Sequence, residues 1–277
     1  DGLGWREEVR YEALSVLAAS VDPQSGLTLA VLESPEQPAF VALSRDWAEV
    51  LRLAEFAPEA PAAATISADG RYAALVGANG VQIIGRDGER VQFAAPAAPF
   101  EAGLALSPDG RYLAYVTRFA AFLLDASSGE TLFSLVPPQV TSLIAGGLAW
   151  SQDGSALAFA HLPFGVSSPR LAVVQVWDIA SASAQTLHSD ETGQLVQALA
   201  WSQDGRHLAG AEAGLNGEFG QAGRIWLWHL ADGDAQQLDV TLDFGWGALT
   251  FLPGEGTLLA SSMEGVRFFM LGHSSDD

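Results

Sequence analysis

One short string recurs along the chain and limits the fold more than any other feature. Serine, a variable residue, aspartate and glycine precede a short apolar run at 67–77, 107–117, 151–161 and 202–212, and weaker copies occur at 22–32 and 252–262. The turn glycines are separated by 44, 40, 44, 51 and 51 residues and are Gly26, Gly70, Gly110, Gly154, Gly205 and Gly256. A unit of this length cannot cover its own apolar faces, so neighbouring units must pack against one another.

The fifth repeat indicates how each unit folds. Residues 196–201 form an apolar strand, the turn 202–205 follows, and 207–211 return as a second strand. Aspartate can accept hydrogen bonds from amides two residues on, and glycine tolerates a positive φ, so the turn is a tight hairpin. Residues 224–228 then supply a third strand and 235–240 a fourth. Four antiparallel strands with a period of about 40–50 residues are typical of a propeller blade.

The repeats predict an all-β fold, a six-bladed β-propeller of four-stranded antiparallel blades in one domain over 1–277. Third strands are expected at 40–43, 81–84, 121–124, 174–177 and 266–270 in the other five repeats. The blades are expected at about 11–57, 58–98, 99–138, 139–190, 191–240 and 241–272. The last repeat ends after its third strand, so we expect residues 4–10 to supply its outer strand and to close the ring without a free edge.

A helix is the competing prediction for two segments. Glu, Ala and Leu dominate residues 6–18, and these residue types favour a helix. The same alternative applies to residues 47–56. The choice between strand and helix is left open at this point.

The repeat strings resemble those of known families. SPDGRYLAYV at 107–116 and LAWSQDGRHLAG at 199–210 are similar to the repeats of WD-repeat and TolB-like β-propellers, and VQVWDI at 174–179 and IWLWHL at 225–230 resemble the strand that ends in Trp-Asp in WD repeats. The resemblance covers about residues 11–272. It implies a propeller fold, six blades in the TolB-like case, and a function in binding other proteins.

Charge and composition exclude several classes of function. The chain has 33 acidic and 13 basic residues, all of the latter arginine, and a net charge of −20. That field repels phosphate backbones, so we expect no nucleic-acid partner. No apolar run is long enough to span a bilayer, so no membrane insertion is expected. The absence of Cys and of an initiator Met favours a processed, exported protein, periplasmic or on the cell surface.

No motif for catalysis or for cofactor binding is recognisable. The five histidines are scattered, and calcium loops, nucleophile elbows and phosphate-binding glycine loops are missing. We therefore predict no catalytic, cofactor-binding or metal-binding residues. The alternative is a propeller hydrolase or lyase acting on a glycan or a peptide at the mouth of the central channel. Its carboxylate pair would come from Glu212, Glu218, Asp190 or Glu191.

Two enlarged connections indicate a binding face. The link between the second and third strands is expanded at 163–170 in the fourth repeat and at 214–223 in the fifth. Loops on one face of a repeat array commonly carry binding. We therefore expect a protein partner to contact loop aromatics and arginines on this face, namely Phe164, Arg170, Phe219, Arg224, Phe244 and Trp246.

Two alternatives to this binding face stay open. The same side chains can fold back over the blades, and the face can bind a carbohydrate or a peptide as part of a surface subunit. Trp150 and Trp201, each four residues before a turn glycine, are expected to pack between blades.

Overall fold

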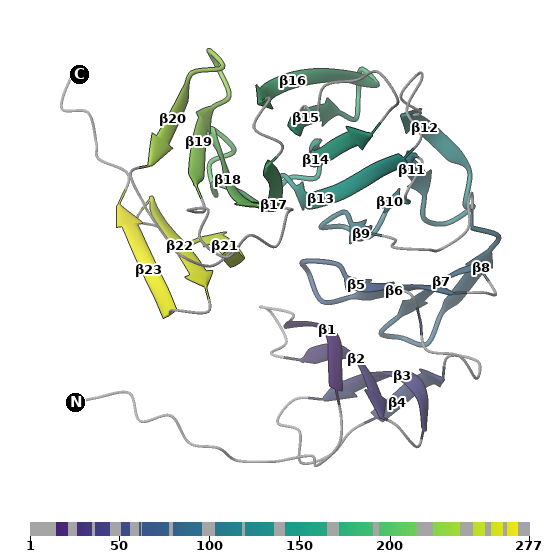
Figure 1. Ribbon diagram of the computed structural model, residues 1–277. Helices are drawn as coiled ribbons and strands as arrows, with labels where there is room; N and C mark the ends of the chain where they lie inside the picture. The colour runs from purple at the N-terminus through teal and green to yellow at the C-terminus, as the bar shows by residue number, and fades with distance from the viewer. Residues whose placement is uncertain are drawn as a thin grey trace, which may run out of the picture. The chain divides into compact units, whose positions relative to one another are not determined.

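The computed structural model describes residues 15–21, 27–34, 37–44, 51–55, 61, 63–77, 80–95, 103–117, 120–135, 142–164, 172–190, 194–214, 224–238, 246–252, 256–262 and 265–270. The 23 strands in this part of the chain form six antiparallel sheets, five with four strands and one with three. Every sheet follows the order of the sequence, so each is a meander (Figure 1). The all-β prediction is confirmed. A search of these residues finds no helix with the length and apolar character that crossing a membrane requires.

The first of two compact units contains sheets 1 to 3, with the last strand included up to Ser134. Sheet 1 consists of β1 (Ser15–Val21), β2 (Thr28–Ser34), β3 (Gln37–Ser44) and β4 (Leu51–Glu55). Sheet 2 consists of β5 (Ala63–Ile66), β6 (Tyr72–Gly77), β7 (Gly80–Gly85) and β8 (Arg90–Phe93). Sheet 3 consists of β9 (Gly103–Leu106), β10 (Tyr112–Val116), β11 (Ala121–Asp125) and β12 (Thr131–Leu135).

The second unit contains sheets 4 to 6. Sheet 4 consists of β13 (Ser142–Trp150), β14 (Ala156–Phe164), β15 (Ala172–Asp178) and β16 (Ser183–Asp190). Sheet 5 consists of β17 (Gln194–Trp201), β18 (His207–Gly214), β19 (Ile225–His229) and β20 (Ala235–Leu238). Sheet 6 has β21 (Trp246–Phe251), β22 (Thr257–Ser262) and β23 (Gly265–Met270).

The recurring string builds the same turn in all four complete repeats. Ser67 Oγ donates to Asp69 Oδ1 at 2.6 Å and accepts a hydrogen bond from the Tyr72 amide at 3.0 Å. Asp69 Oδ1 also accepts from the Arg71 amide at 3.0 Å, as predicted, and Gly70 has a φ of 66°. The equivalent serines with the same bonds are Ser107, Ser151 and Ser202. The buried serine links the aspartate of the turn to the first amide of the returning strand, and this explains why the string recurs.

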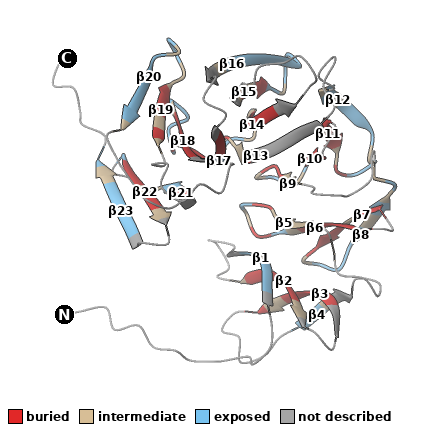
Figure 2. Cartoon of the chain, viewed as in Figure 1, coloured by how far each residue is buried: buried red, intermediate tan, exposed pale blue. Residues whose placement is uncertain are grey.

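Apolar side chains fill the space between consecutive sheets within each unit. Leu29 and Val41 of sheet 1 pack with Leu75 of sheet 2, and one cluster joins sheets 4 and 5 through Val174 and Trp228. The middle strands of the sheets are buried, whereas the outer strands β8, β12 and β20 are largely exposed (Figure 2). Strands covered on both faces carry continuous apolar runs, as the sequence indicates.

One close approach fixes the packing of sheet 5. A Cβ atom built on Gly210 would lie 2.6 Å from Cη2 of Trp228 and 3.0 Å from a methyl carbon of Val196. Trp228 is fully buried. The indole therefore packs directly against the glycine, and a larger residue at position 210 would require the ring or the backbone to shift.

The predicted third strands are confirmed, since β3, β7, β11, β15 and β23 contain them. The helix alternative is wrong where it can be examined: residues 15–18 belong to β1 and residues 51–55 form β4. The predicted closing strand at 4–10 lies outside the described residues. The blade boundaries and the single closed domain stay predictions.

The outer turn of sheet 4 departs from its counterparts. Gly88, Gly129 and Gly233 take a positive φ in the turns that join the third and fourth strands of sheets 2, 3 and 5. In sheet 4 the corresponding turn contains Ala182 with a φ of 51°, the one positive φ at a residue other than glycine in the part described. Asp178 steadies this turn by accepting hydrogen bonds from the amide and the hydroxyl of Ser181, both at 2.7 Å.

Candidate functional site

The structure describes three of the six positions predicted to bind a partner. Phe164 ends β14 opposite Ser142, and Trp246 begins β21 opposite Ser262. The prediction of loop backbone is therefore wrong at these two positions. Arg224 immediately precedes β19. The other three predicted residues lie outside the described part of the chain and are Arg170, Phe219 and Phe244.

Proline at position 163 is the reason that sequence patterns place Phe164 in a loop. A proline removes a hydrogen bond in the interior of a sheet but is tolerated at an edge. The pairing of β14 with β15 ends at His161 and Val173, whereas its pairing with β13 continues through Pro163 to Phe164. Among the described residues, β14 beyond His161 is paired with β13 alone, so Pro163 lies where β14 is not paired with β15 and a proline is tolerated.

The first two strands of sheets 4 and 5 are longer than those of sheets 2 and 3. The strands β13 and β14 have 9 residues each and β17 and β18 have 8, whereas β5, β6, β9 and β10 have 4, 6, 4 and 5. Both long pairs contain a register shift, between Ala145 and Leu148 and between Val196 and Ala198. Bulges of this kind bend and twist a hairpin. These two hairpins extend beyond the common repeat, toward the enlarged connections.

Glu212 and Arg224 form an ion pair where the second enlarged connection leaves and rejoins sheet 5. Arg224 Nε lies 2.7 Å from Glu212 Oε2, and the side chains are 23% and 0% exposed. The Glu212 amide donates to the Arg224 carbonyl oxygen at 2.8 Å. The guanidinium carbon of Arg224 also lies 5.7 Å from the centre of the Trp226 ring. A buried carboxylate needs a partner, so Arg224 neutralises Glu212 and holds the two ends of the connection together.

The structure describes two of the four acidic residues that the enzyme alternative would use, Glu212 and Asp190. The Glu212 carboxylate is compensated by Arg224. Asp190 ends β16, and Glu191 and Glu218 lie outside the described residues. Within the described ranges, no group of three His, Asp or Glu side chains is arranged to hold a metal ion.

His161 occupies the position in sheet 4 that Glu212 occupies in sheet 5, seven residues after the turn glycine. Its ring packs edge-on against Phe159 with centroids 4.9 Å apart, and Nδ1 has no hydrogen-bond partner among the described residues. Burial lowers the pKa of His161 to about 4. The imidazole is therefore neutral at physiological pH and serves as a core side chain.

Two further histidines pair across sheet 5 near its turns. His207 lies opposite His229, with ring centroids 5.2 Å apart, and His229 Nδ1 is 2.8 Å from Asp232 Oδ1. The pKa of His207 is lowered, and burial is the largest cause. The Asp204 carboxylate acts in the opposite direction and raises this pKa. His207 begins β18 and His229 ends β19.

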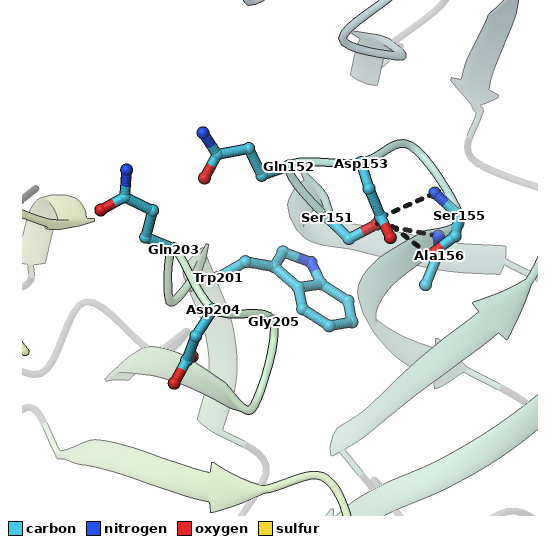
Figure 3. A pocket seen from close by; sticks show the side chains of 9 residues that line it. All are labelled: Ser151, Gln152, Asp153, Ser155, Ala156, Trp201, Gln203, Asp204 and Gly205. Atoms are coloured by element: carbon cyan, nitrogen blue, oxygen red, sulfur yellow. Dashed lines mark hydrogen bonds between the residues drawn. The ribbon is translucent and has the colours of Figure 1, made fainter.

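A pocket of about 560 Å³ lies between the turns of sheets 4 and 5, at the opposite end of these sheets from the enlarged connections. It is lined by Ser151, Gln152, Asp153, Ser155, Ala156, Trp201, Gln203, Asp204 and Gly205. Figure 3 shows the indole of Trp201 between the two turns. Trp201 Nε1 donates to the Ala149 carbonyl oxygen at 2.9 Å, and the ring is partly exposed. Packing between sheets, the role predicted for Trp201, therefore does not explain the part of its ring that lines the pocket.

Comparison with known proteins identifies the fold. No protein-family model matches the chain, and a search of curated proteins finds no significant match. Among solved structures, the β-propeller domain of Cps50 (Swd1) from Myceliophteria thermophila superposes with a TM-score of 0.64 at 13% identity, over 93% of this chain and 84% of that one. Hydrazine synthase from Kuenenia stuttgartiensis gives a TM-score of 0.59 at 16% identity, over 93% and 77%.

The chain is thus an all-β protein with a β-propeller fold. Identities this low establish the fold alone, and folds of this type carry many functions.

Proposed function

We propose that this protein is a non-catalytic interaction or scaffold module that binds a protein partner through the connections 163–170 and 214–223. The observation that carries the proposal is that β13, β14, β17 and β18, with 9, 9, 8 and 8 residues, are longer than the first two strands of every other sheet, which have at most 7. Extra strand length does not add to the common repeat core, since sheets 2 and 3 form without it. It supports and presents the two connections at one end of sheets 4 and 5.

The ion pair at the base of the second connection supports the same proposal. A loop that binds with useful affinity benefits from ends that are already fixed, because less conformational entropy is lost on binding. The bonds between Glu212 and Arg224 fix both ends of residues 214–223. In this arrangement Arg224 is a supporting residue, and the partner contacts fall to Phe164, Arg170, Phe219, Phe244 and Trp246.

The finer architecture is part of the proposal. We propose six blades of WD-repeat or TolB-like type, with residues 4–10 supplying the outer strand of the last blade. Sheet 6 has three strands in the described residues. One face of β23 carries Val266, Phe268 and Met270, which are 54%, 63% and 82% exposed. An apolar sheet face of this kind is expected to be covered in the native protein.

The test compares partner capture by variants with shortened loops. Residues 165–170 and 215–223 are replaced separately and together by short glycine-containing turns, so that β14 and β18 keep their length. The control is Thr131→Ala with Ser134→Ala on the exposed outer strand β12. Proteins that co-purify specifically from the native source are compared by mass spectrometry. Loss of a specific partner with the shortened loops but not with the control is expected; retention of every specific partner after both replacements overturns the proposal.

A further inference from the structure

The pocket between the turns of sheets 4 and 5 is lined by Trp201, and the repeat does not require a tryptophan at this position. The position four residues before the turn glycine is Ile66 in sheet 2 and Leu106 in sheet 3, but Trp201 in sheet 5. The bond from Trp201 Nε1 to the Ala149 carbonyl oxygen holds the indole in one orientation between the two turns (Figure 3). A fixed, partly exposed indole offers its face to a ligand at little entropic cost.

Two carboxylates line the same pocket, and one oxygen of each is fully engaged. Asp153 Oδ1 accepts from the hydroxyls of Ser151 and Ser155 and from the Ser155 amide. Asp204 Oδ1 accepts from the Ser202 hydroxyl and the Arg206 amide. In the described part of the chain, no hydrogen bond is made to Oδ2 of either residue. Each turn thus holds its carboxylate in place and leaves an oxygen for a ligand.

These hydrogen bonds also keep both carboxylates ionised. The backbone bond from Ser155, followed by the hydroxyl of Ser151, lowers the pKa of Asp153 below its usual value. The Ser202 hydroxyl, followed by the Arg206 amide, does the same for Asp204. None of the nine residues that line the pocket is basic, and the chain as a whole carries a charge of −20. The pocket is therefore an anionic site with an aromatic floor.

We propose that this pocket binds a basic side chain of a partner polypeptide, with the cation over the Trp201 indole and beside the carboxylates of Asp153 and Asp204. A guanidinium or an ammonium is attracted to an indole face and to carboxylates, and a guanidinium can also stack on the ring. The amide of Gln152 supplies a donor and an acceptor for the backbone that carries the side chain. The proposal goes beyond the proposed function, because it concerns the opposite end of sheets 4 and 5 and does not depend on the enlarged connections.

The repeats provide a matched control for the test. Asp153→Asn with Asp204→Asn removes two charges and keeps an oxygen acceptor for the turn. Asp69→Asn with Asp109→Asn makes the same change in the turns of sheets 2 and 3, which have the equivalent bonds from the turn serine and the backbone amide but do not line the pocket. Both variants have the same net charge, so a difference between them reports the pocket and not the overall field.

Binding is measured by isothermal titration calorimetry on the intact chain, with the blocked peptides Gly-Arg-Gly, Gly-Lys-Gly and Gly-Gln-Gly and with cellotriose. We expect the arginine and lysine peptides to bind, the glutamine peptide and cellotriose not to bind, and the pocket variant to lose about tenfold in affinity while the control changes less than about twofold. Trp201→Leu, which installs the residue of sheet 3, is expected to weaken binding, whereas Trp150→Leu is not.

Three outcomes overturn the proposal. Equal losses in the pocket variant and the control reveal attraction to the overall charge alone. Binding of cellotriose without binding of the basic peptides assigns the pocket to a carbohydrate. Absence of any peptide binding to the wild-type chain removes the site, and it does so whether or not the enlarged connections bind a partner.

Discussion

Replacement of His161 tests a buried histidine whose pKa is strongly lowered by the surrounding core. The ring lies in sheet 4, is 5% exposed, and has a pKa lowered to about 4 by burial. In the unfolded chain the same imidazole takes up a proton below pH of about 6.5. Between these two pH values the unfolded state binds more protons than the folded state. The free energy of unfolding therefore falls as the pH is lowered through this window.

The magnitude follows from the two pKa values. One unit of pKa difference corresponds to about 1.36 kcal/mol, so the shift of His161 removes about 2 kcal/mol of the free energy of unfolding between pH 7.5 and pH 5. The carboxylates and His207 also titrate toward pH 5, but they are common to the wild type and the variants, so their contributions cancel in the comparison. His161→Phe and His161→Gln have no group that titrates there.

The assay is urea unfolding at pH 7.5 and pH 5, followed by tryptophan fluorescence and by circular dichroism to verify a two-state transition. Each variant is compared with itself at the two pH values, so a constant cost of the substitution cancels. We expect the loss between the two pH values to be about 2 kcal/mol smaller in the variants than in the wild type. A loss of the same size in wild type and variants would refute the argument that burial holds His161 neutral.

Two further substitutions test the packing and the ion pair of sheet 5 by urea unfolding at neutral pH. Gly210→Ala places a methyl group against the Trp228 indole and is expected to destabilise the fold by about 1–3 kcal/mol, and an unchanged midpoint would show that the ring can move aside. Glu212→Gln breaks the buried pair and is expected to cost about 3 kcal/mol, at the lower end for such pairs because Arg224 is 23% exposed. The double change Glu212→Leu with Arg224→Met is expected to recover most of that loss, and a double variant no more stable than Glu212→Gln would contradict the role of the pair.

The strands and turns of this fold can be predicted because their causes are local. Ser67, Asp69 and Gly70 determine a turn by bonds within six residues, and the same residues recur in three other repeats. Residues 51–55 show where local reasoning ends. Their sequence, Leu-Arg-Leu-Ala-Glu, favours a helix, but pairing with β3 makes them a strand. The partner strand is chosen by the tertiary fold and overrides the propensity.

The candidate sites are harder to predict, because they depend on distances between sheets. The repeat alignment places His161 and Glu212 at equivalent positions, but it does not show that one ring is sealed in the core and that the other side chain meets Arg224. The indole of Trp201 has the signature of a core residue, and only the spacing of two turns leaves a pocket beside it. A tryptophan at the position where the second and third repeats have Ile66 and Leu106 was the available signal.

The Ser-x-Asp-Gly turns have a consequence for how such a protein can change. The hydrogen bonds that recur in these turns are made by the serine and the aspartate, whereas the second residue of the string differs between copies. That residue is Ala68, Pro108, Gln152 and Gln203 in successive copies. Substitution at this position can therefore change the side chain presented at the tip of each of these four sheets while the serine, aspartate and glycine that define the turn are kept.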